Sequence, residues 1–520
     1  MKGVCKTLTV LVTFVLLFSM VACDMTGIGL IGKLLELSGG TLPDAIIPEA
    51  TDGENFTWGD VEFDPDGFPL QTTEAESETE PQVIISAPDV DFHGEEIVFL
   101  TRDASEWSTV DIYSPELNSD PINDAVYRRN DVVQSMCGDV IHEIRTSNAT
   151  DAVQRDVLGG GMEYNAIAQK LGESAILASK GYLQNLWNVP YLDLSQSWWD
   201  QNAIAGLSIQ NRLYFATGDL LISDDDGTFA LLFNKQIADE CAIENIYELV
   251  NNGTWTFEAM YEMEKRVCKD LNGNGKMEYD QDIMGIAVNE YTGYCMMYTT
   301  GILIVDKDSD DIPEYVLDNQ RTIDAISLSY LAIGDTLIAA NMNTVNTKDS
   351  VENGVVCFGG GHALFMAECL QRVPRLRRCD VEFGLLPFPK YNESQERYYS
   401  HMNEVGGVIA IPTTCRNLDA TGIVLEAMAA YSTQTLTPAY YDIMLISMNV
   451  RDDESEPMLE MIMNNRIYDL GYVYDSSLSG YVNRIANKFM DGKTDVASVK
   501  PNSFIKQLQK LIKQFEDYDW

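Results

Sequence analysis

Residues 191–235 read YLDLSQSWWDQNAIAGLSIQNRLYFATGDLLISDDDGTFALLFNK, and this stretch carries the clearest signals of how the chain is organised. Near its start, Trp198 and Trp199 are adjacent and are followed by Asp200. The surrounding residues are polar and typical of a loop. Large aromatic side chains beside a carboxylate are common where a protein receives a small ligand.

Two strand-like runs follow, residues 212–218 (RLYFATG) and 228–233 (TFALLF), with the acidic turn DDDG at 224–227 between them. Aromatic, β-rich segments around an Asp/Gly turn predict that the chain here leaves one structural unit and enters another. The alternative is an ordinary hairpin inside one domain, and periodicity alone does not exclude it. A crossing at this point would place the tryptophan pair just before it, where a cleft would lie.

The chain has 520 residues, which is long for one domain and predicts two lobes. Residues 96–100 and 140–144 have strand patterns, whereas residues 124–136, 151–157 and 166–180 have helix patterns. Strands that alternate with helices predict the α/β fold class with a largely parallel sheet. Ligands bind outside the carboxyl ends of the strands in such sheets, where the loop carrying Trp107 would lie.

The charge balance is strongly acidic, with 80 Asp and Glu residues against 35 Lys and Arg residues and a net charge of -45. Nucleic acids and anionic membrane surfaces are bound through basic patches, so this balance argues against both partners. It says little about the fold or about a small ligand. A solubilising acidic surface is sufficient to explain it.

The first 22 residues have the pattern of an export signal. A basic start precedes an apolar run at residues 8–21, which is too short for a comfortable membrane span. The run ends SMVAC at Cys23, which resembles a bacterial lipobox, although Met20 stands where leucine is more usual. By this resemblance residues 1–22 are a lipoprotein signal peptide and Cys23 receives the lipid. The alternative is an ordinary secretory signal with an incidental cysteine.

Residues 23–91 are rich in Gly, Pro, Thr and acidic residues, and residues 72–81 read TTEAESETEP. A segment of this composition cannot bury enough apolar surface to order itself. We therefore predict a disordered acidic tether between the lipid and the folded body.

The cysteines leave two possibilities open. An even number in an exported protein permits disulfides, but no Cys-x-x-Cys pair or small-scaffold spacing is present, and buried free thiols are the alternative. The eight that follow Cys23 are Cys137, Cys241, Cys268, Cys295, Cys357, Cys369, Cys379 and Cys415.

Residues 270–282, DLNGNGKMEYDQD, match the front half of an EF-hand-type calcium loop. Oxygen-bearing side chains occupy positions 1, 3 and 5 and glycine occupies position 6. Position 12 should be an acidic bidentate ligand but is Gln281, so the back half is out of register by one residue. The candidate calcium ligands are Asp270, Asn272, Asn274 and Asp282. The alternative is an Asx- and Gly-rich connector that binds no metal, and no other cofactor is indicated.

Several short segments, each weak alone, occur in the order in which they stand in a known family. They resemble those of bacterial extracellular solute-binding proteins of the maltose-binding-like class, over about residue 92 to the C-terminus. These segments are the lipobox and tether, Trp198-Trp199-Asp200, LFNK at 232–235, WT at 255–256, GHALF at 361–365, GLLPFPK at 384–390 and VIAIP at 408–412.

The resemblance implies a two-lobed periplasmic-binding-protein-like clamshell with hinge crossings that closes on a solute. A second crossing is expected at residues 405–412. Lobe 1 would comprise residues 92–213 and 402–440, and lobe 2 residues 214–401 and 441–520. It also implies a protein that is lipid-anchored at the extracellular face of the cell membrane and delivers its solute to the membrane subunits of an ABC importer.

A carbohydrate is the first ligand to consider, because aromatic faces suit the C–H face of a pyranose and paired polar groups suit its hydroxyls. Trp198 and Trp199 would stack on the sugar, and Asp200 and Glu368 would accept hydroxyl hydrogen bonds. Against this, one of two adjacent tryptophans usually faces the core, and Glu368 could be solvated. The candidate ligand-binding residues are Trp107, Trp198, Trp199, Asp200, Tyr214 and Glu368.

Two other classes of function compete. A secreted carbohydrate-active enzyme could use a carboxylate pair, although any acidic protein offers such pairs by chance. No Gly-x-Ser-x-Gly elbow and no His-Glu-x-x-His motif is present, so we expect no catalytic residues. A cell-surface adhesion module could use the loop at 270–282, but it has one copy and lacks the acid at position 12.

Overall fold

The computed structural model describes residue 85 and residues 90–518, apart from 104–109, 290, 318, 345–349, 377, 380, 448–453 and 491–497. The predicted signal peptide, the lipidated Cys23, nearly all of the predicted tether and Trp107 lie outside these residues. No helix within the described part is long and apolar enough to cross a membrane.

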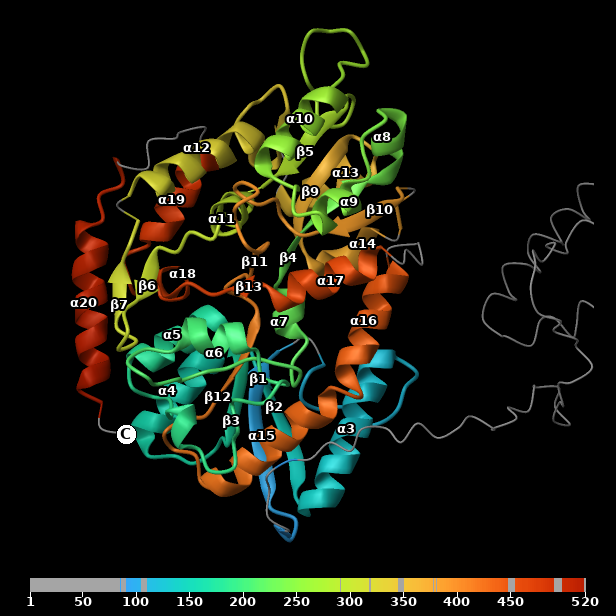
Figure 1. The fold of residues 1–520 in the computed structure, drawn as a ribbon. Helices are drawn as coiled ribbons and strands as arrows, with labels where there is room; N and C mark the ends of the chain where they lie inside the picture. The colour runs from blue at the N-terminus through green and yellow to red at the C-terminus, as the bar shows by residue number, and fades with distance from the viewer. Residues whose placement is uncertain are drawn as a thin grey trace, which may run out of the picture. The chain divides into compact units, whose positions relative to one another are not determined.

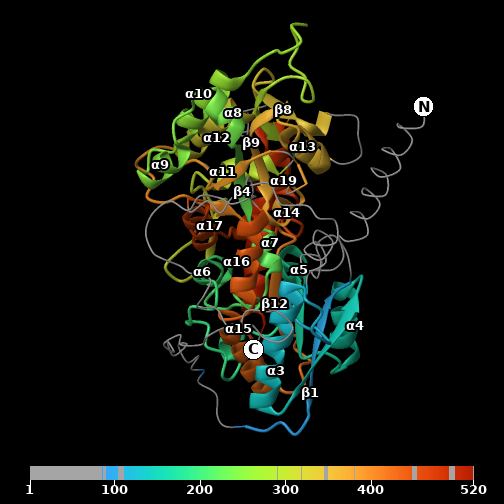
Figure 2. The same cartoon turned by 90° about the vertical axis from the view of Figure 1, so that its right-hand side faces the viewer.

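The first sheet has four strands in the order β12-β3-β1-β2. Both neighbours of β1 run parallel to it, and β12 is antiparallel to β3. Figure 2 shows α3 and α4 on opposite sides of this sheet, as expected for right-handed crossovers that run in opposite directions. The bounds are β1 Glu96–Arg102, α3 Pro121–Cys137, β2 Val140–Thr146, α4 Ala149–Gly159, β3 Ala166–Lys170, α5 Leu171–Ser179 and β12 Gly407–Ala410.

The second sheet has five strands in the order β10-β4-β9-β5-β8. β5 is parallel to β8 and β9, whereas β4 is antiparallel to β9 and β10, so this sheet is mixed. Every residue of β4 and β9 is buried, which explains their continuous apolar sequences. The bounds are β4 Phe229–Asn234, β5 Met284–Val288, β8 Ala339–Asn341, β9 Ala363–Cys369 and β10 Phe383–Leu386.

The remaining elements cover these sheets and connect them (Figure 1). Before β9 they are η2 Leu186–Asn188, α6 Gln201–Leu207, α7 Ser223–Asp226, α8 Lys235–Glu240, α9 Ile246–Asn251, α10 Phe257–Val267, α11 Thr292–Tyr298, β6 Val305–Lys307, β7 Pro313–Tyr315, α12 Gln320–Ile333, η3 Met342–Thr344 and α13 Ser350–Gly359. After β9 they are η4 Leu370–Arg372, α14 Val373–Leu376, β11 Ser400–His401, α15 Leu418–Ser432, α16 Leu436–Ser447, α17 Ser455–Asn464, β13 Arg466–Ile467, α18 Leu470–Val473, α19 Tyr481–Met490 and α20 Asn502–Glu516.

Residues 166–180 are not one helix, so that prediction is wrong. The first five residues form β3, and α5 begins immediately afterwards at Leu171. All but the last residue of β3 are buried, because β1 and β12 flank the strand. A strand that runs directly into a helix leaves no turn residue to mark the boundary.

The first crossing differs in detail from its prediction. Residues 212–218 form no strand and make only isolated bridges, including Ala216 to Ile409 beside the first sheet. The acidic turn is one turn of helix, α7, after which the chain enters β4 of the second sheet. β4 pairs with β9 and β10 and not with residues 212–218, so the hairpin alternative is wrong.

The segment at 402–406, by which the chain returns to the first sheet, lies directly against this crossing. Thr228 bridges Met402 in antiparallel fashion, and the Asn403 amide donates to the Gly227 carbonyl oxygen at 2.9 Å. A Cβ atom on Gly227 would stand 2.8 Å from the Gly406 Cα atom, so glycine permits the close approach of the two backbones. β12 follows at once. The lobe boundaries proposed from the sequence stay a prediction.

None of the eight cysteines after Cys23 forms a disulfide in the structure. Four of them, Cys137, Cys295, Cys357 and Cys369, are buried. Burial raises the pKa of Cys357 to about 12, with a further contribution from the nearby Asp280 charge. These thiols therefore pack as small apolar side chains.

Candidate functional site

A cavity of about 400 Å³ lies beside the tryptophan pair, and we call it the Trp198 cavity. This volume lies within the usual range for small-molecule sites. Its walls come from the loop before α6, the first crossing, α16, and the end of α17 with β13. The lining residues are Ser197, Trp198, Trp199, Asp200, Gln201, Asn202, Gly218, Asp219, Asp225, Thr437, Tyr441, Met463, Asn464 and Arg466.

Asp200 shapes one wall of the Trp198 cavity through local structure. Its side chain caps α6 by accepting from the backbone amides of Asn202 at 2.8 Å and Ala203 at 3.0 Å. Such a cap satisfies amides at the helix start that have no partner within the helix. The other carboxylate oxygen accepts from the Tyr468 hydroxyl at 2.8 Å. Asp200 is therefore fully engaged within the protein.

Arg466 links three carboxylates behind this wall. Its Nε atom lies 2.9 Å from an Asp200 oxygen, and one terminal nitrogen lies 3.0 Å from Asp224 and 2.9 Å from Asp225. The arginine side chain is 9 % exposed and that of Asp224 only 1 %. One cation thus compensates several buried anions, and the rest of their desolvation cost must be met by hydrogen bonds or protonation.

Three carboxyl groups of the first crossing, those of Asp219, Asp225 and Asp226, take up protons near neutral pH. Burial raises the pKa of Asp225 to about 7, although the Arg466 charge opposes the shift. Burial raises the pKa of Asp226 to about 7 and that of Asp219 to about 6, against hydrogen bonds from Tyr440 and Thr437 respectively. Asp219 and Asp225 line the Trp198 cavity, so its polarity depends on pH.

The two tryptophans are oriented by one buried carboxylate on α15. Glu426 accepts from the indole nitrogen of Trp198 at 3.1 Å and from that of Trp199 at 3.0 Å. Trp199 is 1 % exposed and belongs to the core, whereas Trp198 is partly buried. Trp198 is therefore the indole with the greater accessible surface for a ligand.

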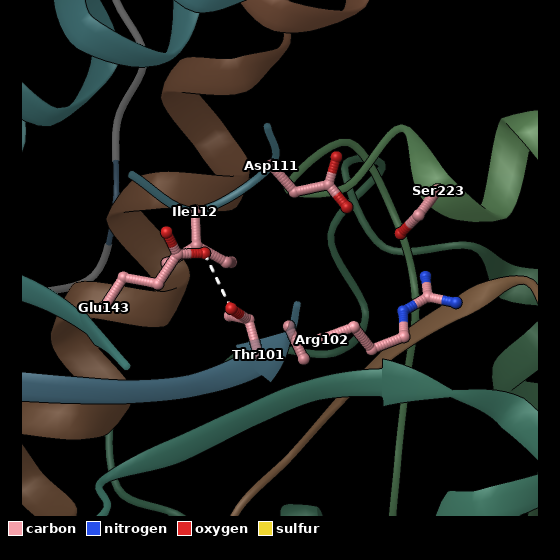
Figure 3. Close-up of a pocket in the computed structure, with 7 residues that line it drawn as sticks. Thr101, Arg102, Asp111, Ile112, Glu143 and Ser223 are labelled. Atoms are coloured by element: carbon pink, nitrogen blue, oxygen red, sulfur yellow. Dashed lines mark hydrogen bonds between the residues drawn. The ribbon is translucent and has the colours of Figure 1, made fainter. Parts of the chain in front are cut away.

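A second, much smaller pocket of about 20 Å³ lies at the carboxyl end of β1, where Glu143 of β2 and Ala168 of β3 also line it. This is room for about one water molecule. Figure 3 shows Arg102, Asp111 and Ser223 pointing toward this space, while Thr101 donates to Glu143 at 2.8 Å. Helix α7 serves both cavities, with Ser223 in this pocket and Asp225 in the Trp198 cavity. As it stands, the strand-end pocket is too small for a sugar.

Of the residues proposed from the sequence, Trp198, Trp199 and Asp200 come together at one cavity. Tyr214 is 1 % exposed and stacks on Phe515 with ring centroids 5.0 Å apart. Glu368 is 3 % exposed in β9 of the second sheet, and one of its oxygens accepts from the amide of Cys369. Neither lines the Trp198 cavity, and the ligand-binding roles of all these residues stay predictions.

Sequence reasoning missed Arg466, Asp219 and Glu426. The acidic run at 224–226 was visible and could have suggested a compensating cation nearby. Nothing in the sequence points to Arg466, because it lies 241 residues from Asp225. The same holds for Glu426, which is 227 residues from Trp199.

The loop at 270–282 is organised by its own acidic side chains. Asp270 accepts from the amides of Gly273 at 2.7 Å and Gly275 at 2.8 Å. Asp282 is fully buried and accepts from the amides of Leu271 and Glu278. Within the described residues no group of three or more His, Cys, Asp or Glu side chains could hold a metal ion.

Comparison with known proteins identifies the fold. No family model matches the sequence, and no curated protein matches it. Among solved structures, an ABC substrate-binding protein of Listeria monocytogenes in complex with cycloalternan is 11 % identical, with a TM-score of 0.51 over 81 % of this chain and 99 % of that one. A family 1 extracellular solute-binding protein of Bifidobacterium longum subsp. infantis is 12 % identical, with a TM-score of 0.51 over 80 % and 100 %.

A maltose-binding protein of Listeria monocytogenes, solved with maltose, is 12 % identical, with a TM-score of 0.50 over 82 % and 99 % of the two chains. At sequence identities this low, the structural similarity establishes the fold alone. The chain has the two-lobed α/β fold of the extracellular solute-binding proteins, and the resemblance inferred from short segments is confirmed at that level.

The buried carboxyl groups predict that stability rises as the pH falls from about 8 to about 6.5. Folded-state pKa values of about 7 for Asp225, Asp226 and Glu426 exceed the value of about 4 expected in the unfolded chain. The folded state then binds more protons in this window, so lowering the pH stabilises it. The measurement is the melting temperature at constant ionic strength.

Protonation of His401 changes the stability in the opposite direction, but at lower pH. Burial lowers its pKa to about 3, so its cost begins only below the unfolded histidine value of about 6.5. Glu426→Gln should flatten the slope above that pH. A melting temperature that falls steadily from pH 8 to 6.5 would contradict the assignment.

Proposed function

We propose that this chain is a lipid-anchored extracellular solute-binding protein that captures a carbohydrate and delivers it to an ABC importer. The fold is one whose solved members include proteins in complex with cycloalternan and maltose. The observation that carries the proposal for this chain is the Trp198 cavity, which combines a partly exposed indole with carboxyl, hydroxyl and amide groups.

The lining of the Trp198 cavity suits a sugar ring. The indole of Trp198 offers a flat apolar surface for C–H groups. Around it, Asn464, Asn202 and Thr437 offer amide and hydroxyl groups that can bind sugar hydroxyls. Asp225 can accept or donate, because its pKa is about 7. Orientation by several convergent polar groups is what gives such sites specificity.

Binding without chemical turnover fits this arrangement better than hydrolysis. A glycosidase needs one carboxyl group as acid and a second as base or nucleophile across the scissile bond. Asp200 and Asp225 are instead ion-paired to Arg466, and Asp219 accepts from Thr437 at 3.0 Å. The alternatives of a carbohydrate-active enzyme or an adhesion module are therefore not favoured.

The sugar proposal is tested by thermal shift of residues 82–520, which form one compact unit. A panel of mono- and oligosaccharides, amino acids and peptides is added at increasing concentration. Ligand that binds only the folded state at about 100 times its Kd stabilises it by about 2.7 kcal/mol. We expect a sugar to raise the melting temperature, and Trp198→Ala to abolish that rise.

The matched control is Trp187→Ala. Trp187 is 47 % exposed and does not line the Trp198 cavity, so this variant should keep the full shift. Stabilisation only by amino acids or peptides, or release of a sugar product from an oligosaccharide, would contradict the proposal.

The lipid anchor at Cys23 is tested by cell fractionation. We expect the natural chain in the membrane fraction and Cys23→Ser in the medium or periplasm, because lipid chains attached at Cys23 would anchor the protein by burying methylene groups, at about 0.8 kcal/mol each. Recovery of both forms from the same soluble fraction would contradict lipidation at this residue.

The loop at 270–282 is proposed as a weak calcium site that uses Asp270, Asn272, Asn274 and Asp282. Hard oxygen ligands with a glycine at the sixth position support it. Millimolar calcium should raise the melting temperature relative to a chelator, and Asp270→Asn should reduce the rise. An identical melting temperature in calcium and chelator would overturn the proposal.

A further inference from the structure

Another polar cavity, of about 410 Å³, lies among the residues that follow α11, the start of α12 and the segment after β10, and we call it the Arg321 pocket. It shares no lining residue with the Trp198 cavity. Its lining residues are Thr300, Gly301, Arg321, Tyr391, Asn392, Ser394, Gln395 and Tyr399.

Arg321 is held in place without a carboxylate. Its guanidinium carbon lies 3.5 Å from the centre of the Tyr391 ring, and one terminal nitrogen donates to the Thr300 carbonyl oxygen at 3.1 Å. No ion pair among the described residues includes Arg321. In a chain of net charge -45, Arg321 is thus an exposed cation that is available to an anionic ligand.

The walls of the Arg321 pocket are preorganised by backbone contacts. The Gln395 side chain accepts from the Tyr391 amide at 2.9 Å and donates to the Thr299 carbonyl oxygen at 2.9 Å. Gly301 has φ of +74°, and a Cβ atom there would stand 2.9 Å from the Tyr399 ring. The tyrosine ring therefore packs against bare backbone, which sets its position.

We propose that the Arg321 pocket binds the carboxylate of an acidic sugar, a uronic acid. A planar guanidinium fork matches a carboxylate through two parallel hydrogen bonds, and a guanidinium stacked on a ring loses little freedom on binding. The partly buried Tyr399 ring offers an apolar face for the sugar carbons. The Asn392 side chain lines the same pocket, and its amide can hydrogen-bond a sugar hydroxyl. An inorganic anion would use the arginine but not the ring.

The test is isothermal titration calorimetry of the full chain with D-glucuronate. D-glucose is the comparison probe that has the same ring but no charge, and inorganic phosphate is the comparison anion that has no sugar ring. We expect saturable binding of glucuronate, at least about tenfold tighter than either comparison probe. Arg321→Gln should weaken glucuronate binding roughly 10- to 100-fold, the range expected for losing a charge-assisted hydrogen-bonded pair.

The control is Arg416→Gln, which removes an exposed cation that does not line the pocket and should leave glucuronate affinity unchanged. Trp198→Ala should also leave the glucuronate affinity unchanged. The two proposals can therefore fail independently, one for the Arg321 pocket and one for the Trp198 cavity. Absence of glucuronate binding, phosphate binding of equal affinity, or an unaltered affinity in Arg321→Gln would each overturn the proposal. Melting temperatures of the variants establish that each is folded.

Discussion

The buried ion cluster around Arg466 is the interaction on which the arrangement of the candidate site depends. Arg466 on β13 reaches Asp200 at the start of α6 and Asp224 and Asp225 on α7. Helix α6 follows the loop that carries the tryptophans, α7 lies in the first crossing, and β13 lies in the C-terminal part of the chain. A charge buried to this extent must be compensated, so separating these elements would leave Arg466 and its buried carboxylates without their partners.

This cluster gives the Trp198 cavity its chemistry as well as its shape. Arg466 compensates only part of the negative charge, and burial leaves neighbouring carboxyl groups with pKa values near 6 to 7. Such groups accept hydrogen bonds when ionised and also donate when protonated, which suits a hydroxyl-rich ligand. The same groups would be poor nucleophiles while they are ion-paired or bonded within the protein, which agrees with the proposed binding function.

Local patterns predicted much of the fold, and non-local contacts explain the errors. Strands β1 and β2 and helices α3 and α4 lie close to the residues predicted for them, because strand alternation and helical periodicity are local signals. The strand β3 was missed because no turn separates it from α5. Residues 212–218 have strand composition but meet only isolated partners, which composition cannot reveal.

The candidate site was predictable only in part for the same reason. The Trp198-Trp199-Asp200 sequence stands out by itself, whereas the partners that orient it, Glu426 and Arg466, are more than two hundred residues away. Side chains such as Tyr214 were chosen for their chemistry, and only the packing against Phe515 shows that the ring is enclosed.

The most direct test of this account is a double-mutant cycle between Arg466 and Asp200. Urea unfolding of the natural chain, Arg466→Met, Asp200→Asn and the double variant gives the coupling free energy of the pair. We expect a coupling of more than about 1 kcal/mol, because either single change already removes the buried Arg466–Asp200 ion pair and the double change cannot remove it again. Additive effects, with a coupling close to zero, would show that Arg466 does not organise the site and would contradict the account.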